Sequence, residues 1–105
     1  MLGDWIPLPD SAPSSYLDLP FELDLAGRRN VQTGVGREMM VLPEEALKYV
    51  DSLMEVRPGD FFFTGTPAGV GPVLPGQEAE VRLLERKRDG EEEAKALVRY
   101  RVRFE

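Results

Sequence analysis

The segment 57–71 (RPGDFFFTGTPAGVG) constrains the fold of this chain more than any other stretch. Its phenylalanines at positions 61–63 form a short apolar run between turn signals, which predicts a buried β-strand. The Pro-Gly-Asp in front of them predicts the turn that starts this strand. We therefore expect a strand that ends in a glycine-rich turn.

The glycine-rich turn contains Gly65, Gly69 and Gly71. A glycine lacks a Cβ atom, so it allows positive φ angles and close approaches to neighbouring backbone. The hydroxyl groups of Thr64 and Thr66 lie beside these glycines, and the turn carries no charge. Amides and hydroxyls at a strand end can receive a carboxylate or an enol oxygen.

The turn does not match the phosphate-binding loops. Its glycines are not followed by the Lys-Ser/Thr pair of a P-loop, and their spacing differs from Gly-x-Gly-x-x-Gly. Taken by itself, the turn has a simple interpretation as a structural β-turn, so a binding role needs support from the rest of the sequence.

That support comes from a resemblance. Residues 56–81 are similar, without a gap, to the C-terminal signature of the fumarylacetoacetate hydrolase family, through Arg-Pro-Gly-Asp, three apolar residues, Thr-Gly-Thr-Pro-Ala-Gly-Val-Gly-Pro and Leu-Pro-Gly-Gln. A weaker likeness extends to the N-terminus. Residues 5–7 (Trp-Ile-Pro) resemble the segment that enters the second half of the family's domain, and residues 23–32 resemble its Asn-Gly hairpin.

The resemblance implies an activity and a site. Members of the family hydrolyse, isomerise, hydrate or decarboxylate small 2-oxo or enol carboxylic acids with Mg²⁺ or Mn²⁺. Their Gly-Thr pair holds the carboxylate or carbonyl end of the substrate, which corresponds to Gly65 and Thr66 here, with Thr64 as a neighbour. We therefore expect Thr64, Gly65 and Thr66 to bind the substrate.

The resemblance also implies what this chain lacks. The family's metal ligands (a Glu-x-Glu pair and a later Asp), its catalytic lysine and the His-Glu pair of its lid all lie upstream of the matched region. Residues 91–93 have Glu-x-Glu spacing, but they follow the turn signal Asp89-Gly90, where a run of charges is normally solvated. We expect no catalytic residue and no metal ligand in this chain, and no activity from it alone. Mg²⁺ or Mn²⁺ would belong to the complete enzyme.

The loop at residues 33–39 departs from the family pattern. Gln32 and Gly34 match a polar loop beside the family's site, whereas Val35-Gly36-Arg37 does not. Arg37 has two interpretations: it meets an anion, or it is a solvated loop arginine, which we favour.

Composition excludes several classes of function. The chain has no Cys and no His, which removes disulfides, thiol nucleophiles and every Ser-His or Cys-His arrangement. Its formal net charge of −6 disfavours a nucleic-acid partner. There is no apolar run near the roughly 20 residues of a membrane span, and no secretory pattern. We therefore expect a cytoplasmic protein without a membrane partner.

Periodicity predicts the remaining elements. Alternation of apolar and charged residues predicts half-buried strands, and Pro43 with Glu44 and Glu45 suits the first turn of an amphipathic helix. The predicted elements are strands 21–25, 30–33, 78–85 and 98–104, turns 26–29 and 89–90, a loop 34–37 and a helix 43–54.

Basic residues gather on the C-terminal hairpin. Arg99, Arg101 and Arg103 share one face of the last predicted strand, opposite Tyr100 and Phe104. Single-stranded nucleic acid is bound by faces that combine cations with aromatic rings, so this face does not fit that role. We expect a solvated or salt-bridged face, formed by these arginines and Arg82, Arg86, Lys87 and Arg88 with Glu78, Glu80, Glu85 and residues 91–93.

The predicted fold is mainly β (α+β): half of a mixed β-roll like that of the family, with one α-helix and a C-terminal β-hairpin. Residues 1–20 should form an extended lead-in anchored by Trp5 and Ile6, and residues 21–105 the half-domain.

Several functions are compatible with the sequence. The leading hypothesis is the C-terminal part of a family hydrolase or isomerase, partnered by a complementary N-terminal half or by copies of itself in a homo-oligomer such as a dimer. The alternatives are a non-catalytic β module that binds a carboxylate or a partner chain, a truncated fragment, and a small β-barrel binding module outside the family.

Overall fold

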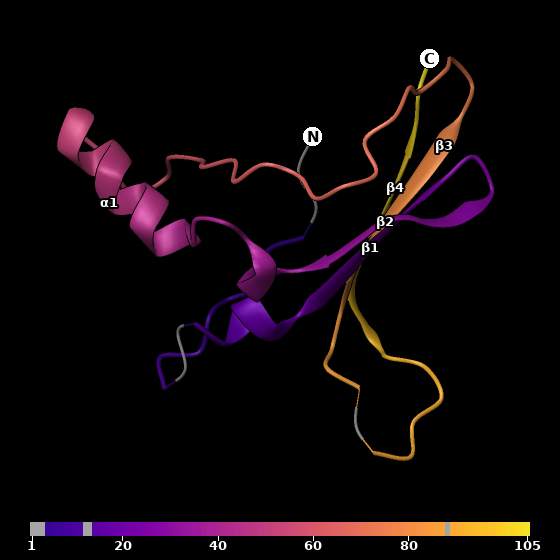
Figure 1. Ribbon diagram of the computed structural model, residues 1–105, viewed down its shortest axis with the longest axis horizontal. Coiled ribbons are helices and arrows are strands. Elements are labelled where there is room, and N and C mark those ends of the chain that lie inside the picture. The colour runs from indigo at the N-terminus through magenta and orange to yellow at the C-terminus, as the bar shows by residue number, and fades with distance from the viewer. Residues whose placement is uncertain (1–3, 12–13, 88) are drawn as a thin grey trace.

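One four-stranded antiparallel sheet organises the computed structural model, which describes residues 4–11, 14–87 and 89–105 (Figure 1). The order of strands in the sheet is β2-β1-β3-β4, so β2 and β4 are its edges. The predicted α+β class is confirmed. The strands are β1 (Pro20–Leu25), β2 (Arg28–Val35), β3 (Glu78–Leu84) and β4 (Ala96–Arg103).

Two hairpins build this sheet. The turn between β1 and β2 uses Ala26 and Gly27, whose φ angles of 51° and 77° are both positive. The second hairpin joins β3 to β4 through a loop that contains the predicted Asp89-Gly90 turn. The central pairing of β1 with β3 joins the hairpins, so residues far apart in sequence become neighbours.

Strand β2 is longer than predicted. Gly34 and Val35, expected in a loop, continue the ladder by pairing with Phe21 and Pro20. Gly34 makes this possible, because a Cβ atom there would lie 2.7 Å from Cζ of the Phe21 ring. The rest of the predicted loop forms a short 3₁₀ helix, η2 (Gly36–Glu38).

The predicted helix is confirmed as α1 (Pro43–Leu53). Pro43 occupies its first turn, followed by Glu44 and Glu45. The helix projects from one side of the sheet (Figure 1), and no residue of α1 is buried. Leu53, on its apolar face, is 68% exposed. No helix in the described ranges is long and apolar enough to cross a membrane.

The predicted buried strand at residues 61–63 is wrong. The stretch between α1 and β3 contains no strand, and Phe63 is 82% exposed. A strand needs a neighbour to accept its ladder of hydrogen bonds, and within the described residues no strand lies beside this one. The turn in front of it is confirmed, since the Asp60 amide donates to the Arg57 carbonyl at 3.1 Å and the Arg57 amide to Asp60 Oδ2 at 2.8 Å.

The lead-in is partly anchored, as expected. The rings of Trp5 and Phe61 lie 5.7 Å apart between centroids. A 3₁₀ helix, η1 (Ser15–Asp18), then brings Leu17 into a buried position against Gly36. Residues 1–3 and 12–13 of the lead-in lie outside the described residues, and its boundary with the half-domain stays a prediction.

The buried core of this chain is small. Among the described residues, the buried apolar side chains are Leu17, Leu25, Ala79 and Leu84. The accessible surface is 8616 Å², whereas a compact domain of this size exposes about 5,900 Å². The radius of gyration is 15.5 Å, against about 13 Å for a compact domain. The chain therefore exposes a large surface that a closed domain would bury.

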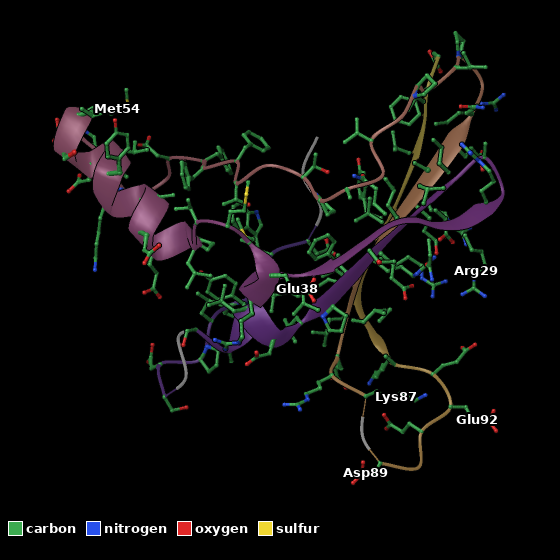
Figure 2. All side chains as sticks on the ribbon, viewed as in Figure 1. Arg29, Glu38, Met54, Lys87, Asp89 and Glu92 are labelled. Carbon is green, nitrogen blue, oxygen red and sulfur yellow. The ribbon has the colours of Figure 1, made fainter. Side chains whose placement is uncertain are left out.

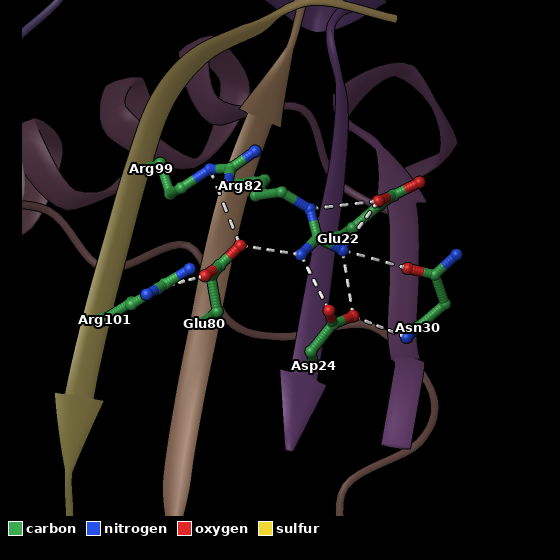
Figure 3. A network of polar contacts seen from close by, with 7 residues as sticks. All are labelled: Glu22, Asp24, Asn30, Glu80, Arg82, Arg99 and Arg101. Carbon is green, nitrogen blue, oxygen red and sulfur yellow. Dashed lines mark hydrogen bonds and ion pairs between the residues drawn. The ribbon is translucent and has the colours of Figure 1, made fainter. Parts of the chain in front are cut away.

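An arginine holds the centre of the sheet together (Figure 3). Arg82 on β3 is only 6% exposed, and its guanidinium donates to Glu22 at 2.9 Å, Asp24 at 2.7 Å and Glu80 at 3.0 Å. These carboxylates come from β1 and β3. A buried cation is tolerated only when it is paired in this way.

The network shifts the ionisation of its members. Hydrogen bonds from Arg82 lower the pKa of Asp24 to about 2. The backbone N–H of Asn30, which donates to Asp24 Oδ1 at 2.7 Å, contributes to this lowering. Hydrogen bonds from Arg101 and Arg82 lower the pKa of Glu80. Hydrogen bonds to Asp24, and then to Glu22 and Glu80, raise the pKa of Arg82.

The predicted salt-bridged face is confirmed at these positions. Arg101 hydrogen-bonds Glu80, and Arg99 lies 3.6 Å from the same carboxylate. Arg88 lies outside the described residues.

Candidate functional site

The glycine-rich turn packs directly on the backbone of β2. Gly69 has a φ of 100°, and a Cβ atom there would lie 2.2 Å from the Val31 carbonyl oxygen. Only glycine fits such an approach. The predicted need for glycine is therefore confirmed at Gly69, and also at Gly65, whose φ is 95°. It is wrong at Gly71, where φ is outside the left-handed region and a Cβ atom would meet open space.

A side chain of β2 holds the same turn. Nε2 of Gln32 donates to Thr66 Oγ1 at 3.0 Å and to the Pro67 carbonyl at 2.9 Å, with the Ala68 carbonyl at 3.4 Å. The partners are more than thirty positions apart in sequence. Gln32 thus fixes the turn from the side, while Gly69 fixes it by close packing.

A pocket of about 720 Å³ lies between this turn and the end of β2. Residues 64–68 form one wall, and residues 33–35 with the segment that follows η2 form the other. Among the described residues, the lining is neutral except for Glu38, which is labelled in Figure 2. The lining residues are Phe21, Thr33, Gly34, Val35, Glu38, Met39, Met40, Val41, Thr64, Gly65, Thr66, Pro67 and Ala68.

The structure brings the three predicted site residues together in this wall. Thr64, Gly65 and Thr66 are consecutive, and all of them line the pocket. Thr33 adds a third threonine from the opposite wall. Hydroxyls and backbone amides that converge on a concave, mostly apolar space are suited to orient the oxygen atoms of a small acid.

The resemblance places the loop 33–39 beside the family's site, but sequence reasoning missed Phe21 and Met40 in the opposite wall. Phe21 lines the pocket because β1 pairs with β2 in a register that opposes it to Gly34. Met39 and Met40 reach the same space after η2. No local pattern reveals these placements. Gln32 did carry a signal, since it matches the family loop beside the site.

Arg37 does not belong to the pocket. Its guanidinium makes two bonds to Asp18, from Nε at 2.6 Å and from Nη2 at 3.0 Å. This pairing links η2 to η1 and lowers the pKa of Asp18. Arg37 is therefore an exposed, paired arginine, which fits neither the anion-binding interpretation nor a purely solvated one.

The residues that the structure describes do not fit the metal that the resemblance implies. Within the described ranges, no group of three or more Asp, Glu, His or Cys side chains is arranged to hold a metal ion. Hard cations such as Mg²⁺ need several oxygen ligands around them. Glu92 and Asp89 lie on the β3–β4 loop, well away from Glu38 in the pocket (Figure 2).

A second, apolar pocket of about 480 Å³ lies where the lead-in meets α1. Its lining includes Ile6, Leu19, Leu47 and Phe62. Burial raises the pKa of Tyr16 in its wall, and the charge of Glu44 adds to that effect. The lining offers few polar groups to orient a small ligand, so we do not consider it the functional site.

Comparison with known proteins agrees with the sequence resemblance. Residues 1–101 match the family described as fumarylacetoacetate (FAA) hydrolase, C-terminal. The chain is 38% identical over 78 residues to an oxaloacetate tautomerase (FAHD2, mitochondrial) of Oryza sativa subsp. japonica, covering 74% of this chain and 33% of that protein. It is 32% identical over 87 residues to a maleylpyruvate hydrolase of Aquipseudomonas alcaligenes, covering 82% of this chain and 29% of that protein.

These relatives are much longer than the matched segment. A third relative, a 2,4-didehydro-3-deoxy-L-rhamnonate hydrolase of a Sphingomonas species, is 36% identical over 70 residues, covering 67% of this chain and 24% of that protein. The chain thus spans about a third or less of these curated relatives. No solved structure matches it.

Proposed function

Because this chain belongs to the fumarylacetoacetate hydrolase family, we propose that it is the substrate-anchoring C-terminal part of an enzyme acting on small 2-oxo or enol carboxylic acids. The observation that carries the proposal is the pocket wall formed by Thr64, Gly65 and Thr66. The named relatives catalyse different reactions, so the proposal covers the shared substrate class and leaves the reaction type open.

The chemistry of the wall suits such a substrate. A 2-oxo acid presents a carboxylate and an adjacent carbonyl oxygen, both of which accept hydrogen bonds. The hydroxyls of Thr64 and Thr66 and the amides of the turn are neutral donors, and a charged acceptor strengthens each bond that they make. The pocket is within the usual size range for small ligands, about 300–1,000 Å³.

The reaction requires groups from outside this chain. Since the described residues do not fit a metal ion, we assign this chain the binding of one end of the substrate and derive no catalytic step within it. We propose that a complementary N-terminal half, of the length by which the relatives exceed this chain, supplies the remaining groups.

The exposed surface supports a complementary half as the partner. The chain exposes about 2,700 Å² more than a compact domain of its size, taking the expected value from the mass scaling. Apolar side chains of α1 and of residues 61–63 contribute to this surface. Apolar surface exposed to this extent is typical of an interaction site. The open sheet, with β2 and β4 unpaired to each other, disfavours the alternative of a closed β-barrel module.

Oxalate, which mimics the enolate of a 2-oxo acid, tests the proposed site. We expect oxalate to shift the backbone amide signals of residues 64–66 in NMR spectra of the ¹⁵N-labelled chain, in a saturable way. Thr66→Val should weaken this binding, and Thr66→Ser, which keeps the hydroxyl, should retain it. Shifts that are absent from these residues, or unchanged by Thr66→Val, would refute the site.

A binding experiment tests the proposed partner. The chain should form a one-to-one complex with a segment that supplies the missing N-terminal half, such as the corresponding part of the rice tautomerase, as measured by sedimentation. Formation of a homodimer in its place would assign the apolar surface to a second copy of this chain. A stable monomer that ignores the added segment would contradict both.

A further inference from the structure

We infer that Gln32 is a positioning residue for the Thr66 hydroxyl: by donating to Thr66 Oγ1, it leaves the hydroxyl proton to be donated into the pocket. The inference rests on the proposed function, because it takes the pocket to be the binding site of an acidic ligand. It adds a residue that contacts no ligand itself and acts through Thr66.

The orientation of the Gln32 amide follows from its partners. The carbonyl oxygens of Pro67 and Ala68 can only accept hydrogen bonds, and both face the same end of the Gln32 side chain. That end must therefore be the NH₂ group, since the amide oxygen would meet the carbonyls as acceptor against acceptor. The same NH₂ group lies 3.0 Å from Thr66 Oγ1, so Thr66 accepts there.

The accepted bond sets the role of the Thr66 hydroxyl. A threonine hydroxyl has one proton to donate and two lone pairs. The bond from Gln32 occupies one lone pair of Thr66 Oγ1. It therefore orients the hydroxyl group and leaves the hydroxyl proton available for donation. Among the described residues, Thr66 Oγ1 donates to no protein acceptor, and Thr66 lines the pocket. A preoriented donor binds an anionic oxygen more tightly than one that must first reorient.

Gln32 is itself held firmly. It lies on β2, half-buried, and pairs with Leu23 of β1 in the sheet. Its neighbour Val31 lies against the turn at Gly69, so close packing of the backbone fixes the strand and the turn to each other beside these hydrogen bonds. The position of the Gln32 amide is therefore set by the sheet, and the turn is matched to it.

A double-mutant cycle separates positioning from simple support of the turn. Gln32→Met keeps the length of the side chain and removes its donors, and Thr66→Val removes the hydroxyl. We expect Gln32→Met to weaken oxalate binding about tenfold in the wild-type background, the order of one hydrogen bond to a charged group. In the Thr66→Val background it should weaken binding little further, because the hydroxyl it positions is gone. Thr66→Ser, which restores a hydroxyl, should restore the coupling.

A second variant reverses the direction of the hydrogen bond to Thr66. Gln32→Glu keeps the length of the side chain, but its ionised carboxylate can only accept, so it should draw the Thr66 hydroxyl proton away from the pocket and also lose the bonds to the Pro67 and Ala68 carbonyls. We expect it to weaken oxalate binding at least as much as Gln32→Met, and to change the Thr66 χ1 population reported by three-bond NMR couplings without oxalate.

The outcomes distinguish this inference from the proposal beneath it. If the wild-type chain does not bind oxalate, the proposed function fails and the inference with it. If the wild-type chain binds oxalate and Thr66→Val binds it measurably more weakly, yet Gln32→Met weakens binding equally in both Thr66 backgrounds, or not at all, then Gln32 does not act through the hydroxyl and the inference alone is overturned.

Discussion

The four-stranded sheet differs from the arm, which we define as α1 together with residues 54–77, in how its polar and apolar side chains are satisfied. In the sheet, the buried cation of Arg82 finds its carboxylate partners within the chain, on two adjacent strands. In the arm, large apolar side chains such as Phe63 and Leu53 are mostly exposed. The sheet satisfies its polar groups internally, whereas the arm exposes apolar groups that a partner would cover.

This difference indicates which region of the chain contains its own interaction partners and which region needs a partner from outside. A buried charge left unpaired would destabilise the sheet strongly, so its partners have to be present in the folded chain. Exposed apolar residues are tolerated until something covers them. The turn that lines the pocket joins the two regions, because Gly69 and the bond from Gln32 to Pro67 fix this part of the arm to β2. Changes in the sheet should therefore affect the isolated chain most, and changes in the arm least.

The largest effect is expected from Arg82→Met. The substitution leaves Glu22 and Asp24 without the cation that pairs with them, beside Glu80, which keeps Arg101 and Arg99. Removing one partner of a buried ion pair destabilises by about 3 kcal/mol or more. We expect the free energy of unfolding, measured with urea and circular dichroism, to fall by that amount, or the sheet to be lost.

Arg99→Gln provides the matched control for Arg82→Met. Arg99 lies one strand away, is 55% exposed and approaches Glu80 only to 3.6 Å. A surface pair of this kind is worth about 0.5 kcal/mol. Equal losses from the two substitutions would contradict the central role given to Arg82.

The second effect concerns the junction between sheet and arm. Gly69→Ala places a Cβ atom 2.2 Å from the Val31 carbonyl at a φ that disfavours it, so the turn should detach from β2 at a cost of about 2 kcal/mol. Loss of protection of the Gln32 side-chain amide against hydrogen exchange would report the detachment. Gly71→Ala, where a Cβ atom meets open space, should change nothing.

Local patterns predicted the elements that depend on neighbours in sequence. The alternation of Val98, Tyr100 and Val102 with arginines located β4, and Pro43 located the start of α1. The same reasoning failed at residues 61–63, because an apolar run becomes a buried strand only where another strand lies beside it. That condition is tertiary, so composition and turn signals cannot report it.

The sequence predicted one wall of the candidate pocket but not the contacts that hold that wall in place. Thr64, Gly65 and Thr66 followed from the family motif, and the structure places them in the wall of one pocket. The contact of Gln32 with Thr66 and the approach of Gly69 to Val31 depend on how the turn docks on β2. Contacts between such distant positions leave no periodic signal in a single sequence.

The third effect is a loss of stability in acid. Asp24 has a pKa of about 2 in the folded chain, against 3.8 ordinarily. Because folding lowers this pKa, the carboxylate stabilises the fold above about pH 4, and that contribution is lost as the pH falls towards 2. With allowance for solvent screening, we expect a loss on the order of 1 kcal/mol in urea unfolding between pH 5 and 2.5.

Asp24→Asn tests the assignment of the acid effect. The amide cannot titrate, so the variant should be less stable at neutral pH and should lose less stability on acidification. Glu80, whose pKa is also lowered, titrates in the same direction and leaves a residual slope. An unchanged pH dependence in Asp24→Asn would show that other carboxylates carry the effect.

The smallest effect is expected in the arm, and it separates folding from assembly. Phe63→Ser and Leu53→Ser remove apolar side chains that contact water already, so each should change the free energy of unfolding of the isolated chain by less than about 0.5 kcal/mol. The same substitutions should weaken the complex with an N-terminal half, since exposed apolar residues contribute to binding only when a partner buries them. Urea unfolding and sedimentation of the same variants measure the two quantities side by side.

A loss of stability from Phe63→Ser comparable to that from Arg82→Met would show that the arm is covered within the chain itself. The surface assigned to a partner would then belong to the folded core.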